Sequence, residues 1–175
     1  MNADEHRADA PGLEVLGALV ERWRTGPGGV RRFVPGVDPR SGGTASRVLV
    51  LMQSPGPGTV AVGDDAICSE DNPGPTAAAF RAARAESGLR RSDYLRWNLI
   101  PWAITGAPRS QDVEEGRWAL AELLAVLPAL ETVVTYGTVA LDGVMRHLTL
   151  SPDARLVHVV AAPHPSPANG RHRAQ

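Results

Sequence analysis

RVLVLMQ, residues 47–53, is a continuous apolar run of strand length, and it decides the fold class. A run that is apolar at consecutive positions is typical of a strand buried on both faces of a parallel sheet. A loop rich in glycine and proline follows it. A helical pattern then begins at Pro75 and ends at Gly88, as expected from the preference for proline at helix starts and glycine just past helix ends. The stretch therefore predicts a strand, a loop and a helix in that order.

The same alternation continues along the chain. Further strands are predicted over residues 93–100, 131–136 and 155–162, and further helices over residues 13–23, 112–127 and 137–147. Trp118 is expected on the buried side of the helix over 112–127, whereas Arg31 and Arg32 are expected to be exposed in a Gly/Pro-rich loop. Four strands that alternate with helices predict an α/β fold with a four-stranded parallel sheet and helices on both faces.

Length and composition fit one domain. The chain has 175 residues, 43% of them hydrophobic, which is enough to bury a core. The first ten residues are polar and acidic, so we predict a disordered segment over 1–10 and a single domain over 11–175. No apolar run reaches the length of a membrane span or a signal core. We therefore expect a cytoplasmic monomer that does not bind membranes.

The charge and cysteine content exclude several classes of site. A net charge of −1 argues against a protein held to nucleic acid by bulk charge, although one local patch can still bind DNA. All 18 basic residues are arginine, which a GC-rich genome explains more simply than a special use of guanidinium. Cys68 is the lone cysteine, which excludes an internal disulfide and a multi-cysteine metal site. No His/Asp/Glu cluster has metal-ligand spacing, so we predict neither a metal nor another cofactor.

Polar side chains follow or end the predicted strands. Gln53 and Ser54 come after the first strand, Asn98 lies near the end of the second, and His164 follows the fourth. Parallel sheets of this kind bind ligands outside the carboxyl ends of their strands. An asparagine in an apolar strand must find partners, either in neighbouring loop backbone or in a ligand. Its paired donor and acceptor suit the edge of a pyrimidine.

The run HPSPAN, residues 164–169, places a histidine between two prolines near the end of the chain. Pro163 and Pro165 fix their own φ angles and hold His164 in a stiff segment. Arg171 and Arg173 come next, and their planar guanidinium groups are suited to contacts with phosphate. Proline also simply ends strands, so the run alone does not decide its own role.

Other polar and aromatic residues are weaker candidates. The acidic segment 63–71 is expected to be a solvated, mobile loop, and any general base comes from its acids, Asp64, Asp65, Glu70 and Asp71. Trp97 is expected in the core, and Trp102 is expected to line the pocket or stack on a base. For His158 we expect a packing role, and for His147 a position at a helix C-terminus that complements the helix dipole.

Four motifs in order resemble those of the uracil-DNA glycosylase superfamily: MQSPGP (52–57), WNLIPW (97–102), VVTYGTVAL (133–141) and HPSP (164–167). The resemblance covers roughly residues 46–170. It implies a three-layer α/β/α fold around a four-stranded parallel sheet and a site that uses no metal. It also implies cleavage of the bond between base and deoxyribose after the nucleotide flips out of DNA.

The resemblance also implies roles for individual residues. His164 hydrogen-bonds the pyrimidine O2 and stabilises the departing anionic base. Asn98 reads the base edge, and Gln53 contacts the base through its backbone. Ser166 grips phosphate beside the flipped nucleotide. Ala168 stands where a bulky residue usually fills the vacated stack, so a side chain from the segment 169–173, which begins with Asn169, is expected to take that place.

The departures from the family pattern affect both water activation and substrate choice. Ser54 stands where the family usually has an aspartate or asparagine, so either it only positions the water or an acid such as Asp65 activates it. Gly56 replaces the tyrosine that crowds pyrimidine C5, and residues 67–69 contain no phenylalanine for stacking. A roomier pocket suggests a 5-substituted pyrimidine, such as a hydroxymethyl or sugar-bearing cytosine of phage DNA. Action on such a base implies a role in defence against phage instead of housekeeping repair.

Three functions follow from these patterns. The first is a monofunctional DNA glycosylase that acts on uracil or another modified pyrimidine and leaves an abasic site. The second is a binder of DNA or free nucleobase that has kept the pocket and lost the acid. The third is a nucleotide or nucleoside hydrolase, which the lack of a phosphate-chain site makes least favoured.

Overall fold

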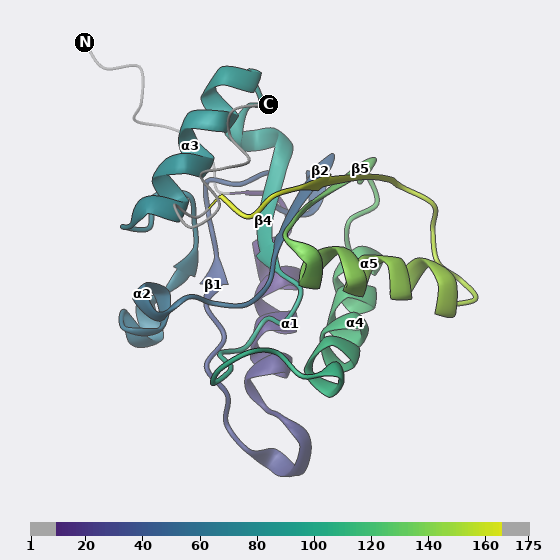
Figure 1. Ribbon diagram of the computed structural model, residues 1–175. Coiled ribbons are helices and arrows are strands. Elements are labelled where there is room, and N and C mark those ends of the chain that lie inside the picture. Colours follow the sequence, from purple (N-terminus) through teal and green to yellow (C-terminus); the bar gives the residue numbers. More distant parts are fainter. Residues whose placement is uncertain (1–9, 166–175) are drawn as a thin grey trace.

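The computed structural model describes residues 10–165, and a four-stranded parallel sheet forms its centre (Figure 1). The strands are β2 (Val48–Met52), β4 (Tyr94–Asn98), β5 (Thr132–Tyr136) and β6 (His158–Ala162). Their order across the sheet is β4-β2-β5-β6, and all neighbours are parallel. The predicted α/β class and parallel sheet are confirmed, and each strand lies within its predicted limits.

The central strand β2 explains why the apolar run is continuous. It pairs with β4 on one side, where Met52 lies opposite Asn98, and with β5 on the other, where Leu51 lies opposite Thr135. Its residues from Leu49 to Met52 are at most 5% exposed. A strand with neighbours on both edges and side chains packed on both faces has no solvated positions, so its sequence does not alternate.

Helices cover the two faces unequally. On one face, Leu49, Leu51 and Trp97 join a large core with α1 (Leu13–Arg24), α4 (Ser110–Ala125) and α5 (Thr138–Leu150). On the other face, Val50 and Tyr94 pack against α3 (Pro75–Ser87) in a smaller cluster. The chain crosses from β2 to the edge strand β4 and returns to β5, so strand order reverses between β2 and β5. Ligands bind outside the carboxyl ends of strands near such a point.

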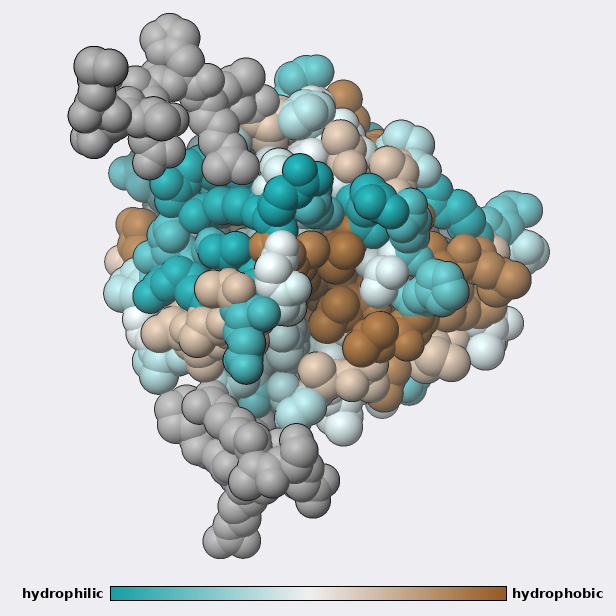
Figure 2. Space-filling model, turned by 90° about the horizontal axis from the view of Figure 1, so that it is seen from above, coloured by the Kyte–Doolittle hydropathy of each residue, from teal (hydrophilic) through white to brown (hydrophobic). Residues whose placement is uncertain are grey.

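On the face of the sheet that packs against α3, the edge strand β6 is partly exposed to solvent. Its Val160 is 50% exposed, and Leu150 and Leu156, before the strand, are more exposed still. Seen from above, hydrophobic surface lies at the centre and right of the molecule, whereas hydrophilic surface gathers toward the left, where α3 lies in Figure 1 (Figure 2).

Short elements fill the segments predicted as loops. Beyond β2 come α2 (Pro57–Val60), η3 (Gly63–Asp65) and β3 (Ile67–Cys68). β3 pairs in parallel with β1 (Gly36–Val37), which forms a second, two-stranded sheet. The remaining short helices are η1 (Pro27–Gly29), η2 (Gly43–Ala45) and η4 (Arg91–Asp93). Strands of two residues are too short to show a period in the sequence, so they were not predictable from it.

Three side chains differ from the sequence predictions. Trp118 is 62% exposed, with the guanidinium of Arg117 stacked 4.4 Å from its ring centre. Arg32 is half-buried, because it stacks over the ring of Trp102 at 3.6 Å. His158 is exposed at the start of the edge strand β6 and is not a packing residue.

The start of the described chain is packed onto the domain. Ala10 is buried and donates its backbone N–H to the carbonyl of Pro39 at 3.0 Å. The predicted disordered segment otherwise falls on residues 1–9, outside the described range. Within residues 10–165, none of the helices combines the length and the apolar character that a membrane crossing requires.

Candidate functional site

A cleft of about 370 Å³ opens at the carboxyl edge of the sheet, above β2 and β4. Its size falls within the roughly 300–1,000 Å³ of small-molecule sites. The segments that line it come from the end of β2, the turn 54–59, β3, the start of α3, the end of β4, and the residue two positions after β6. The lining residues are Met52, Ser54, Pro55, Gly56, Pro57, Gly58, Thr59, Cys68, Asn72, Pro73, Gly74, Pro75, Thr76, Ala77, Arg96, Asn98 and His164.

Asn98 is the last residue of β4 and is only 6% exposed. Its Nδ2 donates to the sulfur of Cys68 at 3.8 Å, and its amide oxygen accepts no hydrogen bond from residues 10–165. Neighbouring loop backbone therefore does not satisfy this amide, and a thiol is a weak acceptor. Burial raises the pKa of the Cys68 thiol, which keeps it neutral. The Asn98 amide is thus buried but free to exchange its partner for a ligand.

His164 is half-buried and enters the cleft from beyond β6. The chain brings it over the end of β5, where Gly137 donates its N–H to Ala162 at 3.0 Å. A Cβ on Gly137 would lie 3.7 Å from the Cβ of His164, and the φ of +87° at Gly137 favours glycine. Burial, assisted by the charge of Arg96, lowers the pKa of His164. The imidazole is therefore neutral near pH 7, with one N–H to donate.

Arg96 is the charged residue of the cleft lining, and the sequence analysis did not single it out. It lies two positions before Asn98 on β4 and is 9% exposed. Its Nε and Nη2 lie 3.3 and 3.0 Å from the sulfur of Met52, and its Nη1 donates to the carbonyl of Ser69. An arginine in a strand that is otherwise buried was the available signal, because charged residues are almost never buried without a partner.

The turn after β2 forms one wall of the cleft. Ser54 is half-buried in this wall, and Gly56 is exposed at its rim. A Cβ placed on Gly56 or on Gly58 meets no atom within 4 Å, so the wall is open there. Gln53 lies just outside the lining, and its carbonyl accepts the N–H of Ile100 at 2.9 Å, which extends the β2–β4 pairing into the turn.

None of the acids in residues 10–165 lines the cleft. Asp64 and Asp65 are exposed in η3, as expected for a solvated segment. The expected solvated loop is wrong for Glu70, which is 2% exposed. Asp71 is in turn paired with Arg91 at 2.7 Å and also with Arg40.

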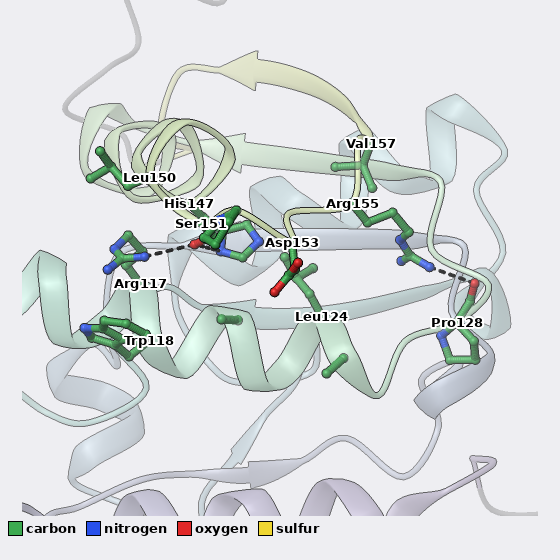
Figure 3. A pocket seen from close by; sticks show the side chains of 13 residues that line it. Arg117, Trp118, Leu124, Pro128, His147, Leu150, Ser151, Asp153, Arg155 and Val157 are labelled. Atoms are coloured by element: carbon green, nitrogen blue, oxygen red, sulfur yellow. Dashed lines mark hydrogen bonds between the residues drawn. The ribbon is translucent and has the colours of Figure 1, made fainter.

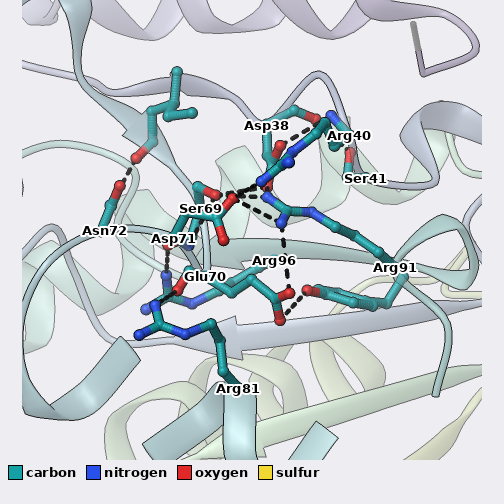
Figure 4. A network of polar contacts seen from close by, with 12 residues as sticks. Asp38, Arg40, Ser41, Ser69, Glu70, Asp71, Asn72, Arg81, Arg91 and Arg96 are labelled. Atoms are coloured by element: carbon teal, nitrogen blue, oxygen red, sulfur yellow. Dashed lines mark hydrogen bonds and ion pairs between the residues drawn. The ribbon is translucent and has the colours of Figure 1, made fainter. Parts of the chain in front are cut away.

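Glu70 belongs to a buried polar network beside the cleft (Figure 4). Its carboxylate accepts hydrogen bonds from Tyr94 Oη and Arg84 Nε, both at 2.7 Å, and pairs with Arg91 at 3.5 Å. Burial and this hydrogen bond to Glu70 raise the pKa of Tyr94, so its phenol keeps its proton. The network fixes the segment that carries Cys68 and contributes Asn72 to the cleft.

Asp38 extends the same network from the end of β1. It is 4% exposed, pairs with Arg91 at 2.5 Å and accepts a hydrogen bond from Ser69 Oγ at 2.8 Å. Burial alone raises the pKa of Asp71, but its hydrogen bonds to Arg91 and Arg40 hold the pKa below its ordinary value. Glu70 and Asp71 are therefore held in ion pairs, whereas Asp64 and Asp65 in the same segment are exposed, as predicted.

The remaining predicted site residues do not meet in the cleft. Trp102 is 6% exposed in the main core beneath Arg32, which corrects the expectation that it lines the pocket. Ser166, Asn169, Arg171 and Arg173 lie outside the described residues.

A larger groove of about 770 Å³ lies between α4 and the segment after α5 (Figure 3). Its walls are mainly apolar, and it lies away from the carboxyl ends of the strands. His147 in this groove is buried, and burial followed by the charge of Arg117 lowers its pKa. His147 lies in the last turn of α5, as predicted, and its lowered pKa favours the neutral imidazole there.

Among residues 10–165, no group of three or more His, Cys, Asp or Glu side chains is arranged to hold a metal ion. The cleft instead combines an amide, a neutral imidazole, a hydroxyl and a guanidinium. This set can read a polar ring edge and stabilise negative charge.

Comparison with known proteins bears on this chemistry. The family model described as the uracil DNA glycosylase superfamily matches residues 39–175, which includes all the cleft-lining residues. Comparison with curated proteins gives no match. The family match points to DNA glycosylase-type activity and to DNA as the molecule acted on.

Proposed function

Because the chain belongs to the uracil DNA glycosylase superfamily, we propose that it is a monofunctional DNA glycosylase. It removes a flipped-out uracil or another modified pyrimidine from DNA and leaves an abasic site. The observation that carries the proposal is the meeting of Asn98 and His164 in one cleft at the carboxyl edge of the sheet. Asn98 offers a donor and an acceptor to the pyrimidine edge, and His164 offers a donor to O2.

The proposed reaction is hydrolysis of the N-glycosidic bond. The C1′–N1 bond breaks, and its electron pair passes to N1 of the base, which leaves as an anion. The oxygen of water bonds to C1′, and the proton that water releases ends on the departed base. His164 stabilises the anion as a neutral hydrogen-bond donor, because burial and Arg96 keep its pKa low.

Ser54 is proposed to position the water. Its half-buried hydroxyl lines the cleft, where the described residues supply no carboxylate. A serine hydroxyl is not a base near pH 7, so it orients the water by hydrogen bonding. An oxocarbenium-like sugar is a strong electrophile, so attack on it depends more on the placement of the water than on its deprotonation.

The substrate class that fits the cleft best is a pyrimidine with a substituent at C5. Gly56 leaves the rim of the cleft open, with no atom within 4 Å of a Cβ placed on it. A hydroxymethyl or glucosylated hydroxymethyl cytosine of phage DNA has its extra group at that position. On such a base the enzyme serves defence against phage and not repair.

A second candidate function is a catalytically inactive DNA- or nucleobase-binding module. The specific observation in its favour is that the lining within residues 10–165 holds Ser54 and no Asp or Glu. Such a module binds the base and leaves the glycosidic bond intact.

The deciding experiment incubates the protein with labelled oligonucleotides that carry uracil, hydroxymethylcytosine or glucosylated hydroxymethylcytosine, and then cleaves abasic sites with alkali. His164→Ala and Asn98→Ala are the site variants, and Asp64→Asn, on an exposed residue outside the lining, is the control. The glycosylase is supported if the wild type and the control cleave a substrate and both site variants do not. Tight DNA binding without cleavage of any substrate overturns it in favour of the binding module.

A further inference from the structure

Arg96 carries a buried positive charge that no acid of residues 10–165 neutralises. Its hydrogen-bond partners there are two neutral groups, the Met52 thioether and the Ser69 carbonyl, and its guanidinium also lies 5.7 Å from the centre of the Phe80 ring. The other buried arginine, Arg117, pairs with Glu114 at 2.5 Å. A buried charge without a counter-charge costs folding free energy. The folded domain therefore holds at Arg96 a buried positive charge that no carboxylate among its described residues balances.

The position of Arg96 relates this charge to the proposed base site. Side chains two apart on a strand point to the same face, so Arg96 and Asn98 both face the cleft, about 6.5 Å apart along β4. Asn98 is at the carboxyl end, and Arg96 lies deeper. His164 lines the same cleft, and the charge of Arg96 adds to the effect of burial in lowering its pKa. The three residues thus surround one volume.

The guanidinium has capacity for a ligand. Three of its five N–H groups are bonded within residues 10–165, two of them to the Met52 sulfur. A thioether is a weak acceptor, so an anionic oxygen or ring nitrogen competes with it easily. A charge-assisted hydrogen bond of this kind is roughly twice as strong as a neutral one.

We propose that Arg96 makes the floor of the cleft an anion site for a pyrimidine, which holds the base in the anionic form that it takes when the glycosidic bond breaks. This inference rests on the proposed function and deepens it. With no acid in the described lining to stabilise the sugar cation, Arg96 and His164 lower the barrier from the other end of the bond, by stabilising the leaving group.

The test compares two free pyrimidines of nearly equal shape at pH 7. Barbiturate is anionic at this pH, and uracil is neutral. Calorimetry or NMR titration gives the affinity of each for the wild type, Arg96→Met, Arg96→Lys and Arg81→Met. Arg81 is the matched control, because it is a half-buried arginine near the cleft that does not line it and bonds only the carbonyl of Glu70 among residues 10–165.

The wild type and Arg81→Met are expected to bind barbiturate roughly tenfold or more tightly than uracil. Arg96→Met is expected to lose this preference, and Arg96→Lys to keep part of it. An equal barbiturate-to-uracil ratio in the wild type and Arg96→Met overturns the inference, as does a failure of both pyrimidines to bind the wild type. Inorganic phosphate is titrated in parallel. Binding of phosphate but not barbiturate at Arg96 also overturns it.

A wild-type measurement covers the case in which Arg96→Met fails to fold. The ultraviolet spectrum of uracil changes when N1 loses its proton, so its ionisation can be followed in the complex. Bound uracil is expected to ionise at least one pH unit below free uracil, and ionisation at the same pH overturns the inference. If the protein cleaves DNA but Arg96→Met prefers barbiturate as strongly as the wild type does, this inference alone is refuted. If the preference for barbiturate depends on Arg96 but the protein cleaves no DNA substrate, the glycosylase proposal alone is refuted.

Discussion

The Nδ2 of Asn98 rests on the Sγ of Cys68 at 3.8 Å, and this long contact is the only hydrogen bond that the side chain makes within residues 10–165. Neutral amides normally find stronger acceptors when they are buried. The contact therefore holds the Asn98 side chain in place but leaves most of its hydrogen-bonding capacity unused. A ligand can take up that capacity.

Replacement of Asn98 by alanine is expected to remove function and leave stability nearly intact. Loss of two hydrogen bonds to the base lowers cleavage about 100-fold. The free energy of unfolding changes by about 1 kcal/mol or less, since only a weak bond to sulfur is lost. Urea unfolding and the cleavage assay measure both quantities.

Asn72→Ala is the matched comparison for this variant. Asn72 also lines the cleft, but its Nδ2 donates to the carbonyl of Ile67 at 2.8 Å. The Asn72→Ala variant is expected to lose more unfolding free energy and less cleavage activity than Asn98→Ala. The reverse pattern contradicts a ligand-reading role for Asn98.

Gly56→Tyr is expected to change substrate choice. The backbone at Gly56 has φ −76° and ψ 163°, an extended conformation that any residue adopts, and the space beside it is open. A tyrosine there narrows the cleft at C5. Cleavage of a glucosylated cytosine is expected to fall about 100-fold relative to uracil. Gly58→Tyr, which also meets open space, tests whether a ring anywhere in the turn has the same effect.

The sheet and its order of elements were predictable because β2 and β4 are buried almost completely. The apolar run of β2 is visible in the sequence, and β4 keeps enough apolar residues around Arg96 and Asn98 to be predicted as a strand. The place of Asn98 and His164 at one edge followed from the same rule, since parallel strands bring their carboxyl ends together.

The rest of the site depended on contacts between distant segments. The two-residue pairing of β1 with β3 leaves no periodic pattern, and it brings Asp38 and Ser69 together across 31 residues of sequence. Glu70 was read as solvated because an acidic run is usually exposed. Its three partners come from α3, η4 and β4, and no local pattern shows that they converge.

His164 is expected to make stability depend on pH. Burial and Arg96 lower its pKa below the usual value of about 6.5, so the unfolded state binds the proton more readily than the folded state. The stabilising contribution is complete above about pH 6.5 and is lost as pH falls toward the folded pKa. NMR titration of the imidazole measures that pKa directly.

His164→Gln isolates this contribution from that of His147, whose pKa is also lowered. The wild type is expected to lose more unfolding free energy than the variant between pH 6.5 and pH 5. Arg96→Met is expected to move the titration of His164 part of the way back toward 6.5. An unchanged midpoint contradicts electrostatic coupling between the two residues.

Arg171 and Arg173 are predicted to contact the DNA backbone. Each arginine that neutralises a phosphate adds about 0.9 to the slope of log affinity against log salt for duplex DNA. The double alanine variant is therefore expected to bind DNA more weakly and with a slope smaller by about 2. Replacement of the exposed Arg22 and Arg47 together is the charge-matched control. An equal change in that control shows a general charge effect.

Glu70→Gln is expected to destabilise the domain and loosen the cleft together. The substitution keeps the shape of the side chain but removes the buried negative charge that faces Arg84 and Arg91. Breaking a buried ion pair in this way costs about 3 kcal/mol. Because Glu70 anchors the segment that carries Cys68 into the cleft, activity falls even where the protein remains folded. Asp64→Asn removes an exposed acid from the same segment and is expected to change the unfolding free energy by less than about 0.5 kcal/mol. Similar losses in both variants contradict an anchoring role for Glu70, whereas a large loss in Glu70→Gln alone shows that Glu70 acts as part of the core and Asp64 does not.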